Sequence, residues 1–374
     1  MFGSVASRSA AIVLALCSGV SLGFAGGPYR VAGSGFDASV RGKAIIWRDG
    51  IVRYWTDQGR LNQAISGADA DAAVAAAFRV WTDVPTAALT AIDAGQLGED
   101  VSGADVAMVA GALELPADTE ISSDEKLVVL YDEGGAITDV RFGAGASDPT
   151  ECVTNAAWSY VDSYATDGHF AHAVLVLNGN CFESIDRLKY VLVRALGRLL
   201  GVGWSQLNDN AYTGKPLPTG IDFAGWPRMH PLDPWCLAYC NFDTRLRTDD
   251  IASISSLYAL TADNVTQWPG KALFHETTAT ISGRVLFADG TPMQGVNVVA
   301  RFWDPVAQRA SRTIAVSAVS GASYVANRGN MVTGDYDTDG LRFDTFGGDD
   351  AELEGYYELP GLPPGQYQIS VEPV

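Results

Sequence analysis

The chain has 374 residues, of which 47% are hydrophobic and 10% aromatic, so it can form two packed domains, and intrinsic disorder is excluded. A formal net charge of −19 at pH 7 argues against nucleic-acid binding, because phosphate contacts need a basic surface. The acidic balance suits instead an exported protein or one that binds cations.

Residues 1–25 have the pattern of a secretory signal peptide. Arg8 gives a basic start, an apolar run follows over 10–20, and Gly23-Phe24-Ala25 offers a small-residue cleavage site. Lipidation at Cys17 is an alternative that the bulky residue before it disfavours. No later segment reaches the roughly 18 uncharged apolar residues that a membrane helix needs. We therefore expect a secreted or extracytoplasmic protein without a membrane span.

Four cysteines follow this segment, Cys152, Cys181, Cys236 and Cys240. An even number in an oxidising compartment favours disulfides. We predict the pairs Cys152–Cys181 and Cys236–Cys240, because the members of each pair are neighbours in sequence. Zinc binding by these four is the alternative, but none of the spacings is the CxxC of common structural zinc sites.

The next stretch, 26–42, is rich in Gly, Ala and Ser, and this composition predicts a flexible lead-in. Apolar segments at 44–47 and 51–55 then flank the pair Asp49-Gly50. This pattern predicts a β-hairpin, or a strand followed by a turn.

Farther along, a helix is predicted over 69–81, where large apolar residues recur at helical spacing. Buried strands are predicted at 127–131 and 172–177, each followed by a glycine-containing turn. A long amphipathic helix is predicted from about 184 to 200. Strands followed by one long central helix indicate an α+β layer arrangement.

Residues 191–205 read VLVRALGRLLGVGWS, which has the spacing of the HExxHxxGxxH helix of secreted zinc proteases. Gly201 matches the glycine of the turn. The positions that carry the chemistry are all replaced, with Arg194 and Arg198 in place of the first two His, Ala195 in place of the general-base Glu and Trp204 in place of the third His. The spacing of a catalytic motif is kept without its ligands.

Two later segments follow in the sequence order that is expected after such a helix. Met229, in the stretch WPRMHP, is similar to the Met-turn of the metzincin peptidases, and residues 249–258 are similar to the closing helix of their matrixin branch. The segment 52–81 is similar to the opening strand and first helix of that family. The chain therefore resembles a matrixin over about residues 43–262, which implies an α+β zincin-like (metzincin) domain.

A linker is expected over 263–276, followed by a second unit, 277–374, in which alternating segments separated by Gly and Pro turns predict an all-β sandwich. Its segments 281–285 and 357–367 resemble the two ends of a carboxypeptidase regulatory-like (transthyretin-like) module, with 306–350 as an insertion. The last residues read as a strand, so we expect this unit to be truncated.

The resemblance implies a zinc site with three ligands and a general base, which the replaced side chains cannot supply. A guanidinium has no lone pair to offer and stays protonated, so Arg194 and Arg198 are not ligands. Ala195 accepts no proton, and the indole of Trp204 coordinates nothing. His230, beside the Met-turn, is the one His expected near the cleft, and one His does not make a zinc site. We predict neither catalytic residues nor zinc here.

The two arginines restore the +2 charge that a zinc ion would carry. In one interpretation they are structural and hold the surrounding loops, with Asp209, Asp222 or Asp233 neutralising them. In the other, Arg194 and Arg198 form an anion-binding site that clamps a peptide carboxylate through bidentate hydrogen bonds. We favour the structural interpretation, because buried charges are usually paired.

Asp335, Asp337 and Asp339 alternate before a glycine, as in the first half of an EF-hand calcium loop. Phe346 occupies position twelve, where such a loop has a bidentate Glu. Calcium is therefore a candidate cofactor at this run, and a solvated acidic loop is the alternative.

The sequence favours a secreted pseudopeptidase, that is, a catalytically inactive metallopeptidase homologue that binds a protein, peptide or cell-surface partner or has a structural role. The competing hypothesis is an active secreted zinc metalloendopeptidase whose ligands come from elsewhere. A third class, an adhesion or matrix module, predicts a cleft filled by side chains such as Trp204 and a partner on the β-sandwich.

Overall fold

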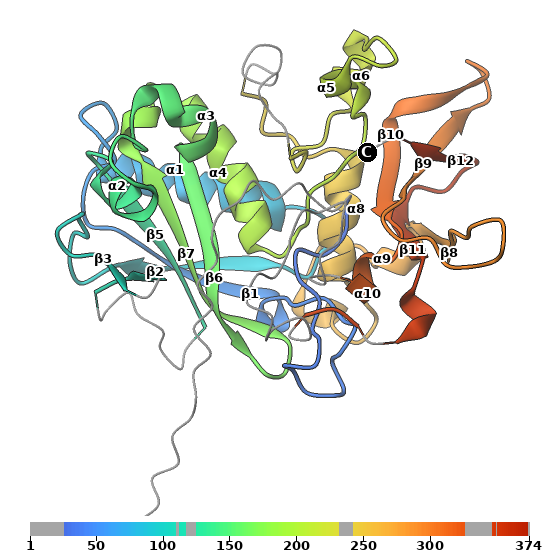
Figure 1. Ribbon diagram of the computed structural model, residues 1–374, viewed down its shortest axis with the longest axis horizontal. Coiled ribbons are helices and arrows are strands. Elements are labelled where there is room, and N and C mark those ends of the chain that lie inside the picture. The colour runs from blue at the N-terminus through green and yellow to red at the C-terminus, as the bar shows by residue number, and fades with distance from the viewer. Residues whose placement is uncertain are drawn as a thin grey trace, which may run out of the picture.

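The computed structural model describes residues 26–109, 112–116, 125–231, 242–325, 346–348 and 350–372. These residues form two parts that lie side by side (Figure 1). The N-terminal part contains a five-stranded mixed sheet with helices, and the C-terminal part contains smaller antiparallel sheets. The expected order of an α+β part followed by a β-rich part is confirmed. Among the described residues, every helix is too short or too polar to cross a membrane.

The N-terminal part is built on one sheet. Its strands are β1 (Ile51–Thr56), β2 (Thr90–Gln96), β5 (Lys126–Asp132), β6 (Ala157–Ala165) and β7 (His169–Asn178). They lie in the order β2-β1-β5-β7-β6, in which all neighbours are parallel except β6, an edge strand antiparallel to β7. The apolar run of β5 suits a central strand covered on both faces. The two predicted buried strands are confirmed as β5 and β7.

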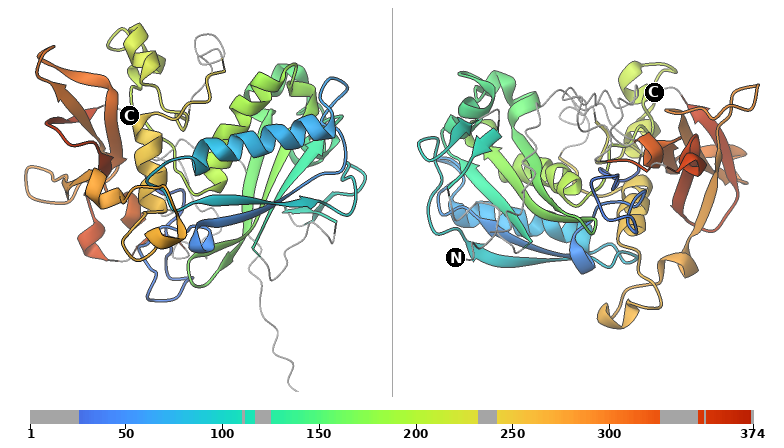
Figure 2. Two further views of the ribbon diagram at one scale, coloured as in Figure 1. Left: turned by 180° about the vertical axis from the view of Figure 1, so that it is seen from behind. Right: turned by 60° about the horizontal axis from the view of Figure 1, so that its bottom comes forward.

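Two helices, α1 (Gly67–Thr82) and α4 (Ile185–Leu199), lie side by side over one face of this sheet (Figure 2). The hydroxyl of Ser66 accepts a backbone N–H of the first turn and so caps α1. At the other end of α1, the buried indole of Trp81 donates a hydrogen bond of 2.9 Å to the carbonyl of Val193 in α4. Both predicted helices are confirmed, and this contact fixes α4 against α1.

The opposite face of the sheet is covered by shorter elements. These are α2 (Ala136–Phe142) and a hairpin of β3 (Ala107–Val109) and β4 (Ala112–Glu114). Ile137 of α2 packs with Val128 and Val176 of the sheet in a second apolar cluster. The sheet is therefore buried on both sides, which explains why its central strands lack the alternation of polar and apolar residues.

A disulfide joins Cys152, at the start of α3 (Cys152–Asn155), to Cys181, just after β7. The Cα atoms of the two residues are 5.3 Å apart, within the normal range for a disulfide. The predicted pair is confirmed. The other predicted pair, Cys236 and Cys240, lies outside the described residues.

The C-terminal part consists of two small sheets. Its strands are β8 (Ala279–Arg284), β9 (Asn297–Asp304), β10 (Arg309–Val319), β11 (Tyr356–Leu362) and β12 (Tyr367–Glu372), with the short helix α10 (Ala322–Val325) after β10. One sheet has the order β10-β9-β12, and β11 pairs with β8 in the other. The segment 306–350 was predicted to be an insertion, but β10 lies within it and pairs antiparallel with β9 as an edge strand of this sheet.

Helix α8 (Thr248–Leu257) lies between the two parts (Figure 1). Its Ile254 packs into the N-terminal core and its Ala252 into the C-terminal core. The helix therefore belongs to both cores, and it confirms the helix predicted over 249–258. The stretch predicted as a linker contains a short helix, α9 (Phe274–Thr277), whose Phe274 is buried.

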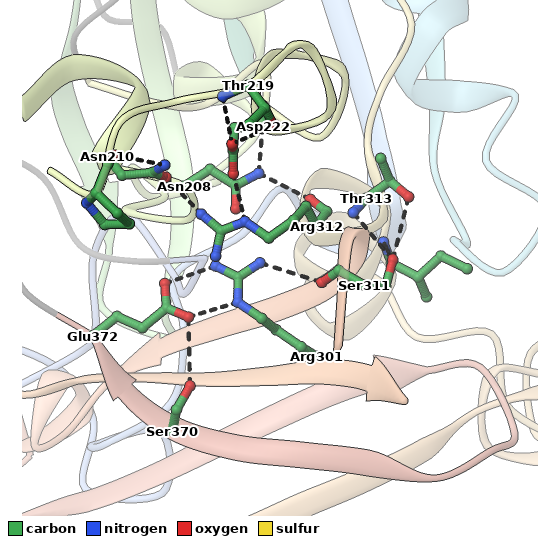
Figure 3. A network of polar contacts seen from close by, with 12 residues as sticks. Asn208, Asn210, Thr219, Asp222, Arg301, Ser311, Arg312, Thr313, Ser370 and Glu372 are labelled. Carbon is green, nitrogen blue, oxygen red and sulfur yellow. Dashed lines mark hydrogen bonds and ion pairs between the residues drawn. The ribbon is translucent and has the colours of Figure 1, made fainter. Parts of the chain in front are cut away.

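A polar network also joins the two parts (Figure 3). It connects the short helices α5 (Asn210–Thr213) and α6 (Gly220–Ala224) to β10. Arg312 of β10 donates to the carboxylate of Asp222 and to the side-chain oxygen of Asn210. Arg301 of β9 lies beside this group and pairs with Glu372 at 2.6 Å. Because Asp222 is buried, its pairing with Arg312 ties α6 firmly to β10.

The predicted hairpin around Asp49-Gly50 is wrong. The turn exists, with positive φ at both residues, but β1 pairs with β2 and β5 on its two sides, so neither side is open to residues 44–47. Those residues instead form bridges, one of which joins Ala44 to Val31. The lead-in that we expected to be flexible thus packs on the N-terminal part, and Val31 is buried.

Candidate functional site

Helix α4 positions the two arginines of the degenerate motif. The hydroxyl of Ser184 caps the helix by accepting from the backbone N–H of Arg187. Its apolar face is buried against the sheet and α1, as expected for the predicted amphipathic helix, while Arg194 and Arg198 are only partly buried. Residues four apart on a helix are neighbours on one face, so the two guanidinium groups lie close together.

The chain turns back directly after α4, at Gly201. This glycine has a φ of +91°, and a Cβ on it would lie 3.2 Å from the carbonyl oxygen of Ile45. Only glycine adopts this backbone freely. The turn brings Trp204 back alongside the end of the helix, as the spacing of the motif predicts.

Trp204 contacts both arginines through its ring. The guanidinium carbon of Arg198 lies 4.5 Å from the ring centroid and that of Arg194 lies 5.4 Å from it. Tyr29, from the lead-in, contacts Arg198 at 3.8 Å. These are cation–π contacts, each of which contributes roughly 0.5–2 kcal/mol depending on its exposure. Three residues that replace zinc ligands in the resemblance therefore form one stacked cluster.

Met229 lies beneath this cluster. It is fully buried, and a Cβ added to Gly197 of α4 would lie 2.5 Å from its sulfur, so the thioether packs directly against the helix backbone. Arg194 donates to the carbonyl oxygen of Arg228 at 2.6 Å, and the backbone N–H of Ser205 donates to the carbonyl of Met229 at 2.8 Å. The helix, the chain after it and the segment around Met229 are thereby joined.

Asp250, at the start of α8, fixes the same segment from below. Its buried carboxylate accepts the backbone N–H groups of Arg228 at 2.9 Å, Met229 at 3.0 Å and Arg247 at 2.8 Å. Burial raises the pKa of Asp250, and these hydrogen bonds oppose the effect. The Asp-Asp pair at the start of the closing helix thus anchors the turn that carries Met229.

The neighbouring carboxylate, Asp249, has a different environment. It is fully buried, and it accepts the backbone N–H of Ser317 from β10 at 2.6 Å. Burial raises its pKa to about 7, and hydrogen bonds from Ser205 and Ser317 oppose this shift. Asp249 therefore links α8 to the C-terminal part.

Two of the three acids expected to neutralise the arginines pair with other side chains. Asp222 pairs with Arg312 (Figure 3), and Asp209 lies 3.6 Å from Nε2 of His230. Asp233 lies outside the described residues. The expectation for Asp222 was wrong because this side chain belongs to the contact between α6 and β10.

His230 follows Met229 directly, and its ring packs 4.4 Å from that of Trp226. His169 and His172, both on β7, bind Asp167 and Asp162 through Nδ1. Within the described ranges, no three His, Cys, Asp or Glu side chains are grouped so that they could hold a metal. The donor set at the motif, two guanidiniums and an indole, does not fit zinc.

The acidic run Asp335, Asp337 and Asp339 lies outside the described residues. Phe346, at position twelve of the calcium-loop pattern, is described and is 1% exposed. Its ring lies 5.7 Å from that of Phe36 and 5.2 Å from that of Tyr164, inside the N-terminal core. This position is therefore used for packing.

No protein-family model matches the sequence, and no curated protein matches it either. Function is therefore inferred from the side chains described above. Two residues that hold this region together, Asp250 and Tyr29, were not anticipated from the sequence. Asp250 had a signal in the acidic pair that opens α8, whereas Tyr29 had none, because a stretch rich in Gly and Ala does not indicate a packed segment.

Proposed function

We propose that this protein is a pseudopeptidase, with a matrixin-like metzincin scaffold that does not perform zinc catalysis. The scaffold is exported and joined to a transthyretin-like β-sandwich, and its role is binding or structural. The mixed sheet with one antiparallel edge strand, the long helix α4 and the buried Met229 behind it support the scaffold. The disulfide between Cys152 and Cys181 supports export.

The observation that carries the proposal is the contact of Trp204 with both Arg194 and Arg198. A zinc site needs lone pairs directed at one point and an open position for water. Here two cations lie against a π face, and the Arg194 guanidinium is further engaged by the carbonyl of Arg228. The side chains of Arg194 and Arg198 supply the positive charge that a metal ion would bring, so the fold around this site is kept without a metal.

Metal content and proteolysis test this proposal on the purified full chain. We expect zinc well below one equivalent by elemental analysis, and no cleavage of unfolded casein that a chelator abolishes. Stoichiometric zinc together with chelator-sensitive cleavage would overturn the proposal in favour of an active zinc metalloendopeptidase with non-canonical ligands.

A reversion variant tests the scaffold itself. It combines four substitutions, Arg194→His, Ala195→Glu, Arg198→His and Trp204→His. If the positions are those of a zinc site, the folded variant binds one zinc with the three new His side chains. A matched control places the same His residues at exposed positions and gains no stoichiometric zinc. A folded reversion variant that binds no more zinc than this control would contradict the matrixin-like scaffold.

A further inference from the structure

The C-terminal part carries an open hollow on its three-stranded sheet. The hollow has a volume of about 450 Å³ and is lined by Trp303 of β9, Tyr367 and Gln368 of β12, and Gln366, which directly precedes β12. This volume lies within the roughly 300–1,000 Å³ of small-molecule sites. β9 and β12 lie away from the five-stranded sheet of the N-terminal part (Figure 1). The hollow is therefore separate from the degenerate motif on α4.

Strand pairing directs Trp303 and the two glutamines to one face of the sheet. The N–H of Trp303 donates to the carbonyl of Gln366 at 2.7 Å, so these two residues are direct neighbours across the strands. Val298 and Ala300 of β9 belong to the C-terminal core. Because side chains alternate along a strand, Trp303 points away from that core, and Gln368, two residues after Gln366, lies on the same face as Gln366.

The polar groups of this face are available to a ligand. Both glutamines are exposed and Trp303 is partly exposed. Within the described residues, the side-chain amides of Gln366 and Gln368 and the indole N–H of Trp303 have no hydrogen-bond partner. An amide offers an acceptor oxygen and two N–H donors, and the indole offers one donor. These groups suit a ligand whose polar groups both donate and accept hydrogen bonds.

The described lining of the hollow is uncharged. Burial raises the pKa of Tyr367, so its hydroxyl is neutral at pH 7. Arg301, which pairs with Gln368 across the strands, donates two hydrogen bonds of 2.6 and 2.7 Å to Glu372, so its charge is balanced (Figure 3). On a chain with a net charge of −19, an uncharged lining disfavours phosphates and acidic peptides as ligands. The ligand that fits is neutral.

The environment of Tyr367 narrows the choice among neutral ligands. Its hydroxyl donates to the carbonyl of Pro363 at 2.5 Å, and its ring packs edge-on against that of Phe302, with centroids 5.7 Å apart. A proline-rich peptide docks in a groove lined by several aromatic rings. Here Tyr367 is engaged by its neighbours, whereas Trp303 keeps its polar group unengaged. This arrangement favours a ligand that stacks on one ring and forms hydrogen bonds beside it.

We propose that this hollow binds a neutral saccharide. One face of a pyranose ring carries C–H groups, which pack on the indole of Trp303, while the hydroxyls exchange hydrogen bonds with the amides of Gln366 and Gln368. A sugar hydroxyl both donates and accepts, as a glutamine amide does. The proposal goes beyond the pseudopeptidase assignment and does not rest on it, because all four lining residues belong to the C-terminal part.

The test uses isothermal titration calorimetry on the purified full chain with three uncharged sugars, cellohexaose, maltohexaose and chitohexaose. We expect at least one of them to bind, with an affinity that does not change between about 50 mM and about 500 mM NaCl, because the lining is uncharged. If none of the three binds, the proposal is overturned. Binding of a polyproline peptide without binding of any sugar also overturns it, in favour of a peptide site.

Variants locate the bound sugar. Trp303→Ala should weaken binding at least about tenfold, because it removes the stacking surface, and Trp303→Phe should retain part of the affinity. Gln368→Glu keeps the size of the side chain but removes its N–H donors, so it should also weaken binding. Trp268→Ala, at another partly exposed Trp outside the hollow, is the matched control and should bind as the wild type does.

The exposed position of Gln368 keeps the test decisive if Trp303→Ala does not fold. Wild-type affinity in folded Trp303→Ala, or in Gln368→Glu where the former is unfolded, overturns the assignment. Zinc content and casein cleavage do not depend on this hollow. Failure of the saccharide site therefore leaves the pseudopeptidase proposal standing, and chelator-sensitive cleavage would leave the saccharide site standing.

Discussion

The guanidinium carbon of Arg198 lies 4.5 Å from the centroid of the Trp204 ring, so two residues that replace metal ligands in the resemblance contact each other directly. The same ring also faces Arg194. Two like charges at positions i and i+4 repel, and an aromatic face shared between them offsets part of that repulsion. Arg194, Arg198 and Trp204 therefore stabilise one another at the positions of a ligand set. Replacement of any one of them should weaken the contacts of the other two.

Replacement of Trp204 by Ala should destabilise the protein by about 2–4 kcal/mol, because it removes two cation–π contacts and leaves a cavity. Trp204→Phe keeps a π face and should cost less. Urea unfolding of the two variants measures the difference. Equal stability of wild type and Trp204→Ala would show that the ring does not hold the arginines.

Arg194→Ala should lower the free energy of unfolding by about 1–3 kcal/mol, since it leaves the carbonyl of Arg228 without this charged donor. Arg194→Lys retains the charge and serves as the matched control. A titration of both variants with a short acidic peptide separates the two interpretations of the pair. If Arg194→Ala and Arg198→Ala leave both melting and peptide binding unchanged, neither a structural nor an anion-binding role survives.

The buried carboxylate of Asp249 predicts a pH dependence for the stability of this chain. The folded state holds the proton of Asp249 up to its pKa of about 7, whereas an unfolded chain releases it near the ordinary value of 3.8. The stabilisation is complete below that ordinary value and is lost as the pH rises toward 7, by at most about 4 kcal/mol.

Urea unfolding between pH 4.5 and 7.5 measures this loss. Asp57, whose pKa burial raises to about 6, contributes in the same direction, so the decisive quantity is the difference between this chain and its Asp249→Asn variant. The decline should be smaller in the variant. Parallel pH profiles for the two proteins would contradict the assignment of this loss to Asp249.

Phe346→Ala should destabilise the N-terminal part by about 3–5 kcal/mol, although the residue belongs to the C-terminal half of the sequence. Its ring is buried with those of Phe36 and Tyr164. Val306→Ala, at a side chain that is 91% exposed, is the control and should be neutral. Thermal denaturation followed by tryptophan fluorescence reports the N-terminal core.

Calcium binding at Asp335, Asp337 and Asp339 remains a hypothesis with a direct test. A ligand that binds only the folded state raises the melting temperature, so millimolar calcium should stabilise the protein relative to excess chelator, and Asp337→Asn should abolish the difference. Identical melting in calcium and chelator would leave the run as a solvated acidic loop.

The parts of the fold that sequence predicts are those with strong local patterns. α4 shows apolar periodicity over 15 residues, and β5 is a continuous apolar run, which are the patterns of a helix packed on one face and of a strand buried on both. β10 was missed because its first half, Arg309 to Thr313, is polar, and its membership in a sheet depends on a partner strand distant in sequence. The hairpin at Asp49-Gly50 was predicted from a sound turn signal, but β1 already had partners on both sides.

The residues of the candidate site also divide into those with a local sequence signal and those without one. Motif spacing placed Arg194, Arg198 and Trp204 close together, because a helix and a turn determine their relative positions. The resemblance to the Met-turn placed Met229 behind them. The partner of Asp222 was not predictable, because Arg312 is 90 residues away along the chain and approaches only when β10 packs on α6. Contacts of this kind depend on tertiary packing, for which a single sequence carries no local signal.

The bond between Cys152 and Cys181 has a practical consequence for each of these measurements. It closes a covalent loop over a sequence separation of 29 that contains β6 and β7. A loop of that size contributes about 3–4 kcal/mol in the chain-entropy model. Protein produced in a reducing cytosol would lack this contribution, and small substitutions could then unfold it outright. Material for the comparisons should therefore come from an oxidising compartment, with free thiols counted before any variant is ranked.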